Sequence, residues 1–169
     1  MYPEDKQKEV PYPMSRKNPF AMPILKWVGG KRQLLDSINP LSPECSTYYE
    51  PFIGGGAVLF GRQPNKAVIN DSNEELINVY RMIKEEPEEL IAALSAHKKQ
   101  NCEEYYYTVR AWDRDKETYQ TRTNVERAAR IIYLNKTCYN GLFRVNSSGE
   151  FNSPWGRYKN PNITNEATI

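Results

Sequence analysis

Histidine and cysteine are scarce in this sequence, which limits the metal and redox chemistry it can carry. The 169 residues include one histidine, His97, and three cysteines, Cys45, Cys102 and Cys138. A single imidazole leaves little room for a zinc site or a catalytic triad built on histidine. Three widely spaced thiols exclude a CxxC metal site and a disulfide framework. We therefore expect reduced thiols in a cytoplasmic protein and no bound metal.

Long apolar runs and a strong net charge are missing as well. No apolar run approaches the ~20 residues that span a membrane, and the N-terminus lacks the apolar core of a signal peptide, so we expect no membrane contact. The net charge of +2 excludes a polybasic or acidic tail. Residues 130–169 nevertheless hold five basic and two acidic side chains, and the chain has twelve tyrosines. This basic C-terminal quarter is a mild indication of a polyanionic partner.

The first part of the chain has the pattern of an α/β protein. Residues 1–23 contain five prolines and no apolar periodicity, so we expect an irregular extension without a core. From residue 24 onwards the pattern predicts helices over 31–38, 57–62, 72–86 and 88–96 and strands over 47–53 and 67–71. Ser72 and Glu75 resemble a capping box for the helix that ends before Pro87. This order is the opening of a doubly wound sheet.

The second part of the chain has a different pattern. Residues 98–122 are polar and rich in tyrosine and contain no strand of useful length. Asn124 is a candidate cap for the amphipathic helix that follows it. The alternating segments 143–145 and 150–152 flank the turn 146–149, which ends in glycine. This arrangement predicts a β-hairpin.

A glycine turn and a carboxylate occupy the positions where α/β proteins bind nucleotides. Gly54-Gly-Gly56 separates the first predicted strand from its helix, where glycine permits positive φ angles and the close approach of a ligand. Phosphate motifs are absent, because Leu59 replaces the third glycine of GxGxxG and Arg32 follows Gly30-Lys31. Asp71 closes the second strand and can accept hydrogen bonds from two ribose hydroxyls. This pattern favours a nucleoside cofactor such as S-adenosylmethionine, and the alternative is a tight turn with a helix-capping Asp.

Five motifs follow one another in an order and spacing that resemble the Dam family of DNA adenine-N6 methyltransferases. They are Lys26-Trp-Val-Gly-Gly-Lys-Arg32, Glu50-Pro-Phe-Ile-Gly-Gly-Gly56, Asn70-Asp-Ser-Asn73, Leu134-Asn-Lys-Thr-Cys-Tyr-Asn-Gly-Leu-Phe-Arg144 and Gly149-Glu-Phe-Asn-Ser-Pro-Trp-Gly-Arg-Tyr-Lys159. The match covers residues 24–161. The resemblance implies an α/β fold: an S-adenosylmethionine-dependent methyltransferase core, Rossmann-like and truncated, with a mainly helical target-recognition domain that carries a β-hairpin.

The resemblance implies S-adenosyl-L-methionine as the cofactor and assigns five residues to it: Trp27, Lys31, Asp71, Gly54 and Gly56. An indole can cover the adenine ring or attract the sulfonium by a cation–π interaction. A lysine can pair with the carboxylate of the cofactor. The alternatives are a core anchor for Trp27 and a solvated helix start for Lys31.

The resemblance also implies double-stranded DNA as the substrate, with GATC as the target site. Seven residues match family positions that contact DNA: Lys26, Tyr139, Asn140, Leu142, Arg144, Pro154 and Tyr158. A tyrosine at position 139 could stack where a base leaves the duplex, and an arginine at position 144 suits a guanine edge. Four further basic residues are expected to contact phosphates or to be solvated charges: Arg130, Lys136, Arg157 and Lys159.

One motif of amino-group methyltransferases is missing. The tetrapeptide [DNS]PP[YFW], which accepts hydrogen bonds from the adenine amino group, occurs nowhere in the sequence. The nearest string, Asn152-Ser-Pro-Trp155, has Ser in place of the first Pro and falls within the predicted hairpin, so we assign no catalytic residue. A cytosine-5 methyltransferase is disfavoured because no Cys follows a Pro.

We therefore expect the N-terminal portion of a site-specific DNA adenine-N6 methyltransferase, inactive alone. Its expected parts are an irregular extension over 1–23, the first part of the core over 24–96, the recognition domain over 97–161 and a polar tail over 162–169. Two alternatives stay open. The chain is either a non-catalytic DNA-binding module, or one subunit of a split methyltransferase whose second polypeptide completes the sheet.

Overall fold

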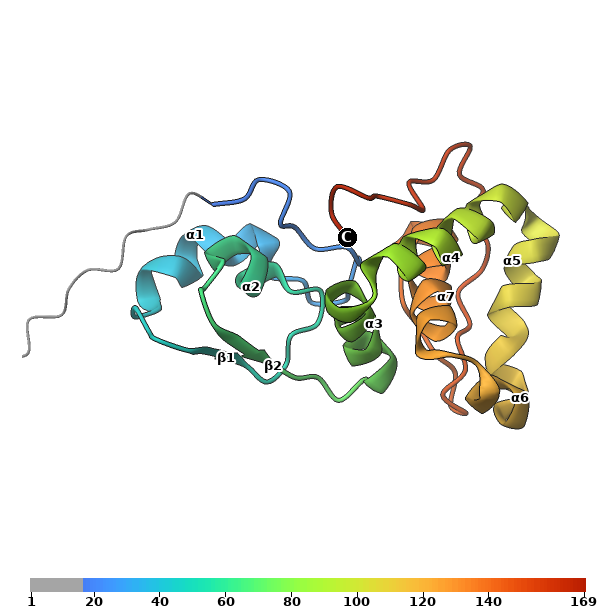
Figure 1. Ribbon diagram of the computed structural model, residues 1–169, viewed down its shortest axis with the longest axis horizontal. Coiled ribbons are helices and arrows are strands. Elements are labelled where there is room, and N and C mark those ends of the chain that lie inside the picture. The colour runs from blue at the N-terminus through green and yellow to red at the C-terminus, as the bar shows by residue number, and fades with distance from the viewer. Residues whose placement is uncertain (1–16) are drawn as a thin grey trace, which may run out of the picture.

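The computed structural model describes residues 17–169, so most of the irregular extension expected over 1–23 lies outside the described residues. In the described chain a small strand unit and a larger helical unit lie at opposite ends, with α3 (Glu74–Glu85) between them (Figure 1). The other elements are α1 (Leu35–Ile38), β1 (Tyr48–Glu50), α2 (Ala57–Arg62), β2 (Ala67–Ile69), α4 (Pro87–Gln100), α5 (Glu103–Arg110), α6 (Lys116–Thr121) and α7 (Asn124–Thr137). No helix of the described range is both long and apolar enough to cross a membrane.

The strand unit is a parallel pair joined by a helical crossover. Its register runs from Tyr48 opposite Ala67 to Glu50 opposite Ile69, and α2 makes the connection that parallel strands require. β1 is shorter than the pattern predicts because Pro51 has no N–H to donate to a ladder. The described chain is thus a mixed helix-and-sheet protein with a two-stranded parallel sheet.

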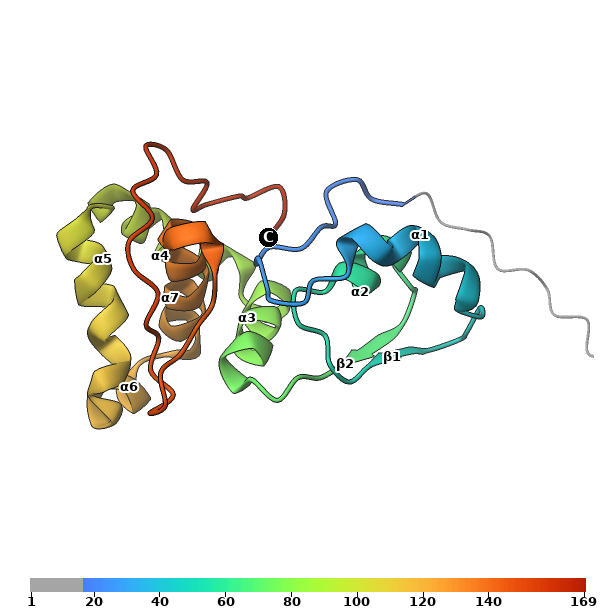
Figure 2. The same cartoon turned by 180° about the vertical axis from the view of Figure 1, so that it is seen from behind.

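The helical unit is built around α7, which lies between α3 and α5 in both views (Figures 1 and 2). Helices α3, α4 and α5 pack against it. Helix α4 spans the boundary expected between residues 96 and 97, and it packs on both α3 and α7. The apolar core of this unit includes Leu76, Val79, Leu90, Leu94, Tyr106, Val109, Ala128, Ala129, Ile132 and Tyr133. Because α7 is surrounded, its polar residues Arg130 and Asn135 are buried too and need partners inside the protein.

The first turn of α3 differs by one residue from the predicted capping box. The cap is Asn73 and not Ser72, because the Asn73 side chain accepts the Leu76 N–H at 3.0 Å. Glu75 makes no return bond to the cap, since its carboxylate pairs with Arg127 of α7. The expected motif therefore becomes a link between two helices.

The cap of α7 is also shifted by one residue, to Thr123 instead of Asn124. The Thr123 hydroxyl oxygen accepts the Glu126 N–H at 3.2 Å, and the Glu126 carboxylate accepts the Thr123 N–H at 2.8 Å. This reciprocal capping box satisfies two N–H groups at the helix start. A single asparagine cap would satisfy one of them, which explains the shift.

The predicted hairpin is present as a turn with an isolated bridge instead of two continuous strands. Val145 forms an antiparallel bridge with Phe151, and the Asn146 N–H donates to the Glu150 carbonyl at 2.9 Å. Gly149 closes the turn with a φ of +79°, a conformation that favours glycine.

Candidate cofactor pocket and DNA-contact surface

A pocket opens at the carboxyl ends of β1 and β2, the edge at which parallel α/β sheets bind ligands. It encloses about 230 Å³. Four of the five residues expected to bind a cofactor line it: Trp27, Lys31, Gly54 and Asp71. The fifth, Gly56, lies directly before α2. The structure therefore brings residues of three separate motifs to one place.

Packing against neighbouring side chains requires glycine in the turn 54–56, in addition to any need for a ligand to approach it. Gly54 and Gly56 have φ angles of +50° and +74°, which residues with a side chain rarely adopt. A Cβ at Gly56 would lie 2.7 Å from the Phe60 ring and 2.8 Å from the Tyr80 hydroxyl. The Tyr80 hydroxyl donates to the Gly54 carbonyl at 2.8 Å, and a Cβ at Gly54 would lie 3.2 Å from the Trp27 ring. Glycine is thus required here by packing within the protein.

Asp71 borders the pocket with each carboxylate oxygen bonded to one backbone N–H. Oδ2 accepts the Gly54 N–H at 2.9 Å, and Oδ1 accepts the Asn73 N–H at 3.1 Å. These bonds hold the carboxylate between the glycine turn and α3. A carboxylate oxygen can accept more than one hydrogen bond, so both oxygens keep capacity for a ligand. The cap of α3 is Asn73, which leaves Asp71 free of that role.

Glu50 is a second carboxylate in the pocket, and its sequence motif had not indicated a role for it. It ends β1 as Asp71 follows β2, it lines the pocket, and its Oε2 accepts the Tyr48 hydroxyl at 3.1 Å. Burial raises the pKa of Glu50, and the nearby Lys31 charge opposes that rise. The signal for it was available, because a carboxylate at the end of each parallel strand places two acceptors at one sheet edge.

Trp27 is both a wall of the pocket and part of the packing around the core. Its ring lines the pocket and stacks on the ring of Phe143, with centroids 4.6 Å apart and planes at 24°. Phe143 in turn packs edge-on against Phe151 at 5.5 Å. The two interpretations offered for Trp27, ligand contact and core anchor, are compatible in this geometry. The pocket and the hairpin therefore share an aromatic contact.

The seven residues expected to contact DNA are all exposed. Lys26, Asn140 and Tyr158 line a second hollow of about 290 Å³ beside the end of α7. Tyr139 is 60% exposed, and its N–H donates to the Pro154 carbonyl at 2.8 Å. The structure thus groups five of the seven around one end of this helix.

The other two residues, Leu142 and Arg144, lie on the first arm of the hairpin. The Arg144 Nε donates to the Asn152 Oδ1 at 2.8 Å across the hairpin, which orients the guanidinium group. The Ser153 hydroxyl donates to the Leu142 carbonyl at 2.5 Å, and the Ser153 carbonyl accepts the Tyr106 hydroxyl at 2.8 Å. The Asn-Ser-Pro-Trp string therefore stabilises the hairpin.

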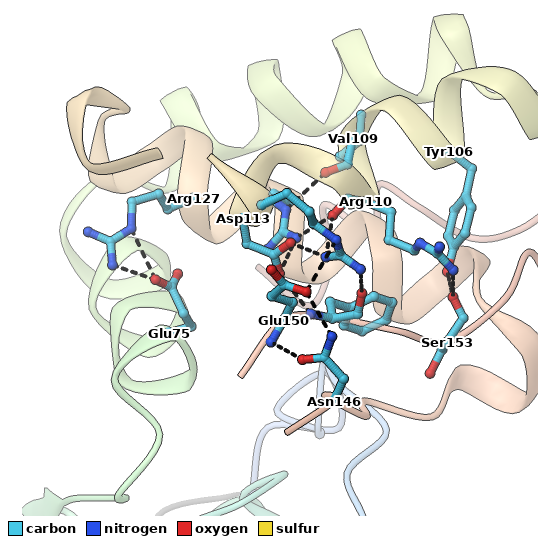
Figure 3. Close-up of polar contacts among 12 residues, drawn as sticks. Glu75, Tyr106, Val109, Arg110, Asp113, Arg127, Asn146, Glu150 and Ser153 are labelled. Carbon is cyan, nitrogen blue, oxygen red and sulfur yellow. Dashed lines mark hydrogen bonds and ion pairs between the residues drawn. The ribbon is translucent and has the colours of Figure 1, made fainter. Parts of the chain in front are cut away.

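Arg130 neither contacts solvent nor is free to meet a phosphate, which corrects the expectation for this residue. Its side chain is 2% exposed, pairs with Asp113 at 2.8 Å, and donates to the carbonyls of Val109 and Arg110 at 3.0 and 2.9 Å. Asp113 also accepts the Phe151 N–H at 2.8 Å. Figure 3 shows Asp113, Val109 and Arg110 in this network. Arg130 thus helps to hold the hairpin on the helical unit.

The other three basic residues of this group differ in exposure. Lys136 is half-buried, and burial lowers the pKa of its ammonium group. Arg157 and Lys159 are exposed, as a contact with a phosphate requires. No group of three or more His, Cys, Asp or Glu side chains within residues 17–169 is arranged to hold a metal ion.

The class of protein follows from this architecture together with a sequence match. The model of the D12 class N6 adenine-specific DNA methyltransferase family matches residues 27–169. That range contains the pocket, α7 and the hairpin, and it is most of the chain. The chain belongs to this family.

Curated relatives make the comparison more specific. The chain is 53% identical over 148 residues to the type II methyltransferase M1.LlaDCHI of Lactococcus lactis subsp. cremoris, covering 87% of the chain and 52% of that relative. It is 42% identical over 164 residues to the type II methyltransferase M.MjaIII of Methanocaldococcus jannaschii, covering 87% and 56%. It is 38% identical over 140 residues to the DNA adenine methylase of Escherichia coli K12, covering 82% and 49%. The chain spans about half the length of these relatives.

Proposed function

We propose that this chain forms the cofactor-binding and DNA-reading part of a site-specific DNA adenine-N6 methyltransferase that uses S-adenosyl-L-methionine. The observation that carries the proposal is the stack of Trp27 on Phe143, which joins a wall of the pocket to the hairpin. A methyltransferase must bring a methyl donor and a base together, and a pocket beside a reading surface meets that need. In this proposal residues 24–96 belong to a Rossmann-like core and residues 97–161 to the recognition domain.

The chemistry of the pocket fits the proposed cofactor group by group. Glu50 and Asp71 offer acceptors for ribose hydroxyls, and Lys31 offers a cation for the carboxylate. Trp27 offers an aromatic face for the adenine ring or the sulfonium. The cofactor supplies a methyl group on a positively charged sulfur. The residues of this chain bind it and fix its orientation next to the hairpin.

The exposed residues around α7 and the hairpin support the reading of a short duplex site, which we propose to be GATC. Arg144 is oriented by its bond across the hairpin and suits a guanine edge. Leu142 suits a thymine methyl, and Lys26 and Tyr158 share a hollow that suits the outer guanine. Tyr139 is exposed enough to stack where the target adenine leaves the duplex.

The sequence lacks [DNS]PP[YFW], so binding of the cofactor and of DNA by this chain does not imply transfer of the methyl group. No residue of this chain matches the group that accepts hydrogen bonds from the adenine amino group. We therefore propose that the chain holds the donor and the DNA and does not itself transfer the methyl group.

Three measurements on the chain test the proposal. S-adenosylhomocysteine is titrated by calorimetry, and duplexes with GATC or a scrambled site are compared by fluorescence anisotropy. GATC DNA incubated with the chain and S-adenosylmethionine is then challenged with a nuclease that adenine methylation blocks. We expect binding of both ligands, a preference for GATC and full cleavage. Duplex binding without binding of S-adenosylhomocysteine would favour a DNA-binding module. Protection from the nuclease would mean that the chain does transfer the methyl group, which would overturn that part of the proposal.

One observation favours a second candidate, a subunit whose sheet is completed by another polypeptide. Tyr49 and Val68 are register partners on one face of the sheet and are 68% and 48% exposed. Parallel sheets are normally covered on both faces. Mixing the chain with a separate family segment that carries [DNS]PP[YFW] should give a complex on size-exclusion chromatography and protection of GATC sites. Separate elution of the two polypeptides would contradict this candidate.

A further inference from the structure

Asn135, in the last turn of α7, is a buried amide whose hydrogen bonds join two distant segments. It is 2% exposed. Its Oδ1 accepts the Lys26 N–H at 3.0 Å, and its Nδ2 donates to the Lys26 carbonyl at 2.9 Å and to the Gly141 carbonyl at 3.0 Å. Both hydrogens of the Nδ2 group are therefore engaged within the protein.

The two segments belong to the two candidate sites. Lys26 directly precedes Trp27, the wall of the pocket, and Gly141 ends the turn that begins at Tyr139. Gly141 has a φ of +62°, and a Cβ there would lie 3.2 Å from the Lys26 side chain. The turn thus packs closely on the segment before the pocket. The stack of Trp27 on Phe143 is a second contact between the two sites.

The backbone offers one donor, the Lys26 N–H, and two acceptors, the carbonyls of Lys26 and Gly141. Among common side chains, an amide matches this set with its one oxygen and two N–H groups. The oxygen must face the Lys26 N–H, because a side-chain N–H cannot accept, and this fixes the orientation of the amide. Aspartate would keep that bond but would turn a carboxylate toward two carbonyl oxygens. Alanine would leave three partly buried backbone groups without this partner, which is unfavourable.

We propose that Asn135 is a positioning residue that couples the cofactor pocket to the DNA-contact turn. A ligand bound against Trp27 fixes the backbone at Lys26. Because Asn135 is bonded to both Lys26 and Gly141, it then holds Gly141 in a fixed position, and the turn from Tyr139 to Gly141 is ordered before DNA binds. Thermodynamic linkage requires that DNA tighten cofactor binding by the same factor. The inference rests on the proposed function, because both ligands must bind this chain.

The experiment measures the coupling factor, which is the affinity of the chain for S-adenosylhomocysteine with a saturating GATC duplex divided by its affinity without DNA. We expect a factor of about five or more in the unchanged chain, within the usual range of coupling between sites. In Asn135→Ala and Asn135→Asp the factor should fall toward one, and the part that remains is carried by the stack of Trp27 on Phe143. Circular dichroism and thermal melting establish that each variant is folded, and the aspartate variant serves if alanine unfolds the chain.

The matched control is Asn78→Ala in α3. Asn78 is a buried amide whose Nδ2 donates to the Asn124 carbonyl at 2.8 Å, so it joins two helices without touching the segments at Lys26 or Gly141. This variant should lower stability and keep the coupling factor. A factor of one in the unchanged chain, or an unchanged factor in the Asn135 variants, would overturn the inference while leaving the proposed function intact. No binding of either ligand to the unchanged chain would overturn both.

Discussion

At the scale of single residues, Asp71 combines a structural and a ligand-binding position. Its two oxygens already hold the N–H groups of Gly54 and Asn73, and they border the pocket. Substitution therefore removes charge where a ligand hydroxyl would donate and loosens the glycine turn. The effect on ligand affinity should exceed the effect on the fold, because the residue is only half-buried.

We expect Asp71→Asn to weaken S-adenosylhomocysteine binding by roughly tenfold to a hundredfold, since hydrogen bonds to a charged group contribute about 1.5–3 kcal/mol. Calorimetric titration measures the change. Glu74→Gln, an exposed carboxylate in the first turn of α3, is the control and should leave the affinity unchanged. Equal affinities for the Asp71 variant and the unchanged chain would remove Asp71 from the site.

Arg144 is the residue on which site preference depends in the proposed function. Arg144→Ala should lower the ratio of GATC to scrambled-duplex affinity by roughly fivefold or more, because a two-bond contact with guanine discriminates by about 1–3 kcal/mol. Anisotropy titrations with both duplexes give this ratio. Arg157→Ala, also exposed, should weaken both duplexes alike and keep the ratio. An equal loss of affinity for both duplexes in the Arg144 variant would mean that Arg144 contacts a phosphate and not a base.

The sequence was informative about residue types and uninformative about burial. Trp27, Lys31 and Asp71 were expected at one site from their match to family motifs, and all three line the pocket. Arg130 could not, because its burial depends on Asp113 and on the carbonyl groups of another helix. The chain alone does not indicate which charge will meet a partner from a distant segment.

At the scale of elements, the hairpin depends on the ion pair beneath it. Asp113 accepts the Phe151 N–H and pairs with both Arg114 and the buried Arg130, and Arg114 donates to the Phe151 carbonyl at 2.6 Å. Removal of the carboxylate would leave Arg130 charged and buried without a counter-ion. The arm of the hairpin that contains Phe151 would lose its fixed position at the same time.

We expect Asp113→Ala to lower the free energy of unfolding by about 3–5 kcal/mol, the usual effect of breaking a buried ion pair. Urea unfolding followed by circular dichroism measures the change. Asp36→Ala, an exposed carboxylate of α1, should change it by less than about 0.5 kcal/mol. If Asp113→Ala lowered the free energy of unfolding by less than about 0.5 kcal/mol, the ion pair would contribute little to the stability of the fold.

Element types were easier to predict than element ends. Helix α2 has the predicted bounds, and the strands β1 and β2 lie within the predicted ranges. The observed caps of α3 and α7 each lie one residue from the predicted cap, because two neighbouring polar side chains were candidates for the same N–H groups. In α3, Glu75 pairs with Arg127 and therefore makes no bond to the cap. Helices α5 and α6 were missed, because both are short and lie in a polar, tyrosine-rich segment of the sequence.

At the scale of the whole molecule, stability is linked to pH through the one histidine. His97 is 5% exposed, stacks on Tyr133 with centroids 4.9 Å apart, and has its Nδ1 2.9 Å from the Tyr105 hydroxyl. Burial lowers its pKa to about 4, the charge of Arg122 acts in the same direction, and Glu126 opposes it. The folded protein therefore keeps this imidazole neutral at pH values where the unfolded chain, with a pKa of about 6.5, protonates it.

The free energy of unfolding should fall as the pH drops from about 6.5 to about 4, since the unfolded state binds the extra proton across that window. Above about 6.5 the histidine makes no pH-dependent contribution. The full effect is on the order of 3 kcal/mol. Urea unfolding at a series of pH values measures it, and His97→Gln should flatten the profile within the window. An unchanged profile in that variant would assign the acid sensitivity to other groups.

The bonds between Lys26 and Asn135 also have a consequence for synthesis of the protein. The two residues are 109 positions apart. At a translation rate of about 5–20 residues per second, the segment beside Trp27 waits about 5–20 s for the amide that holds it. During that time its apolar neighbours Ile24 and Leu25, which are buried in the finished core, have no α7 to cover them. Until α7 leaves the ribosome, the nascent chain exposes these two apolar side chains, and transiently exposed apolar surface favours aggregation.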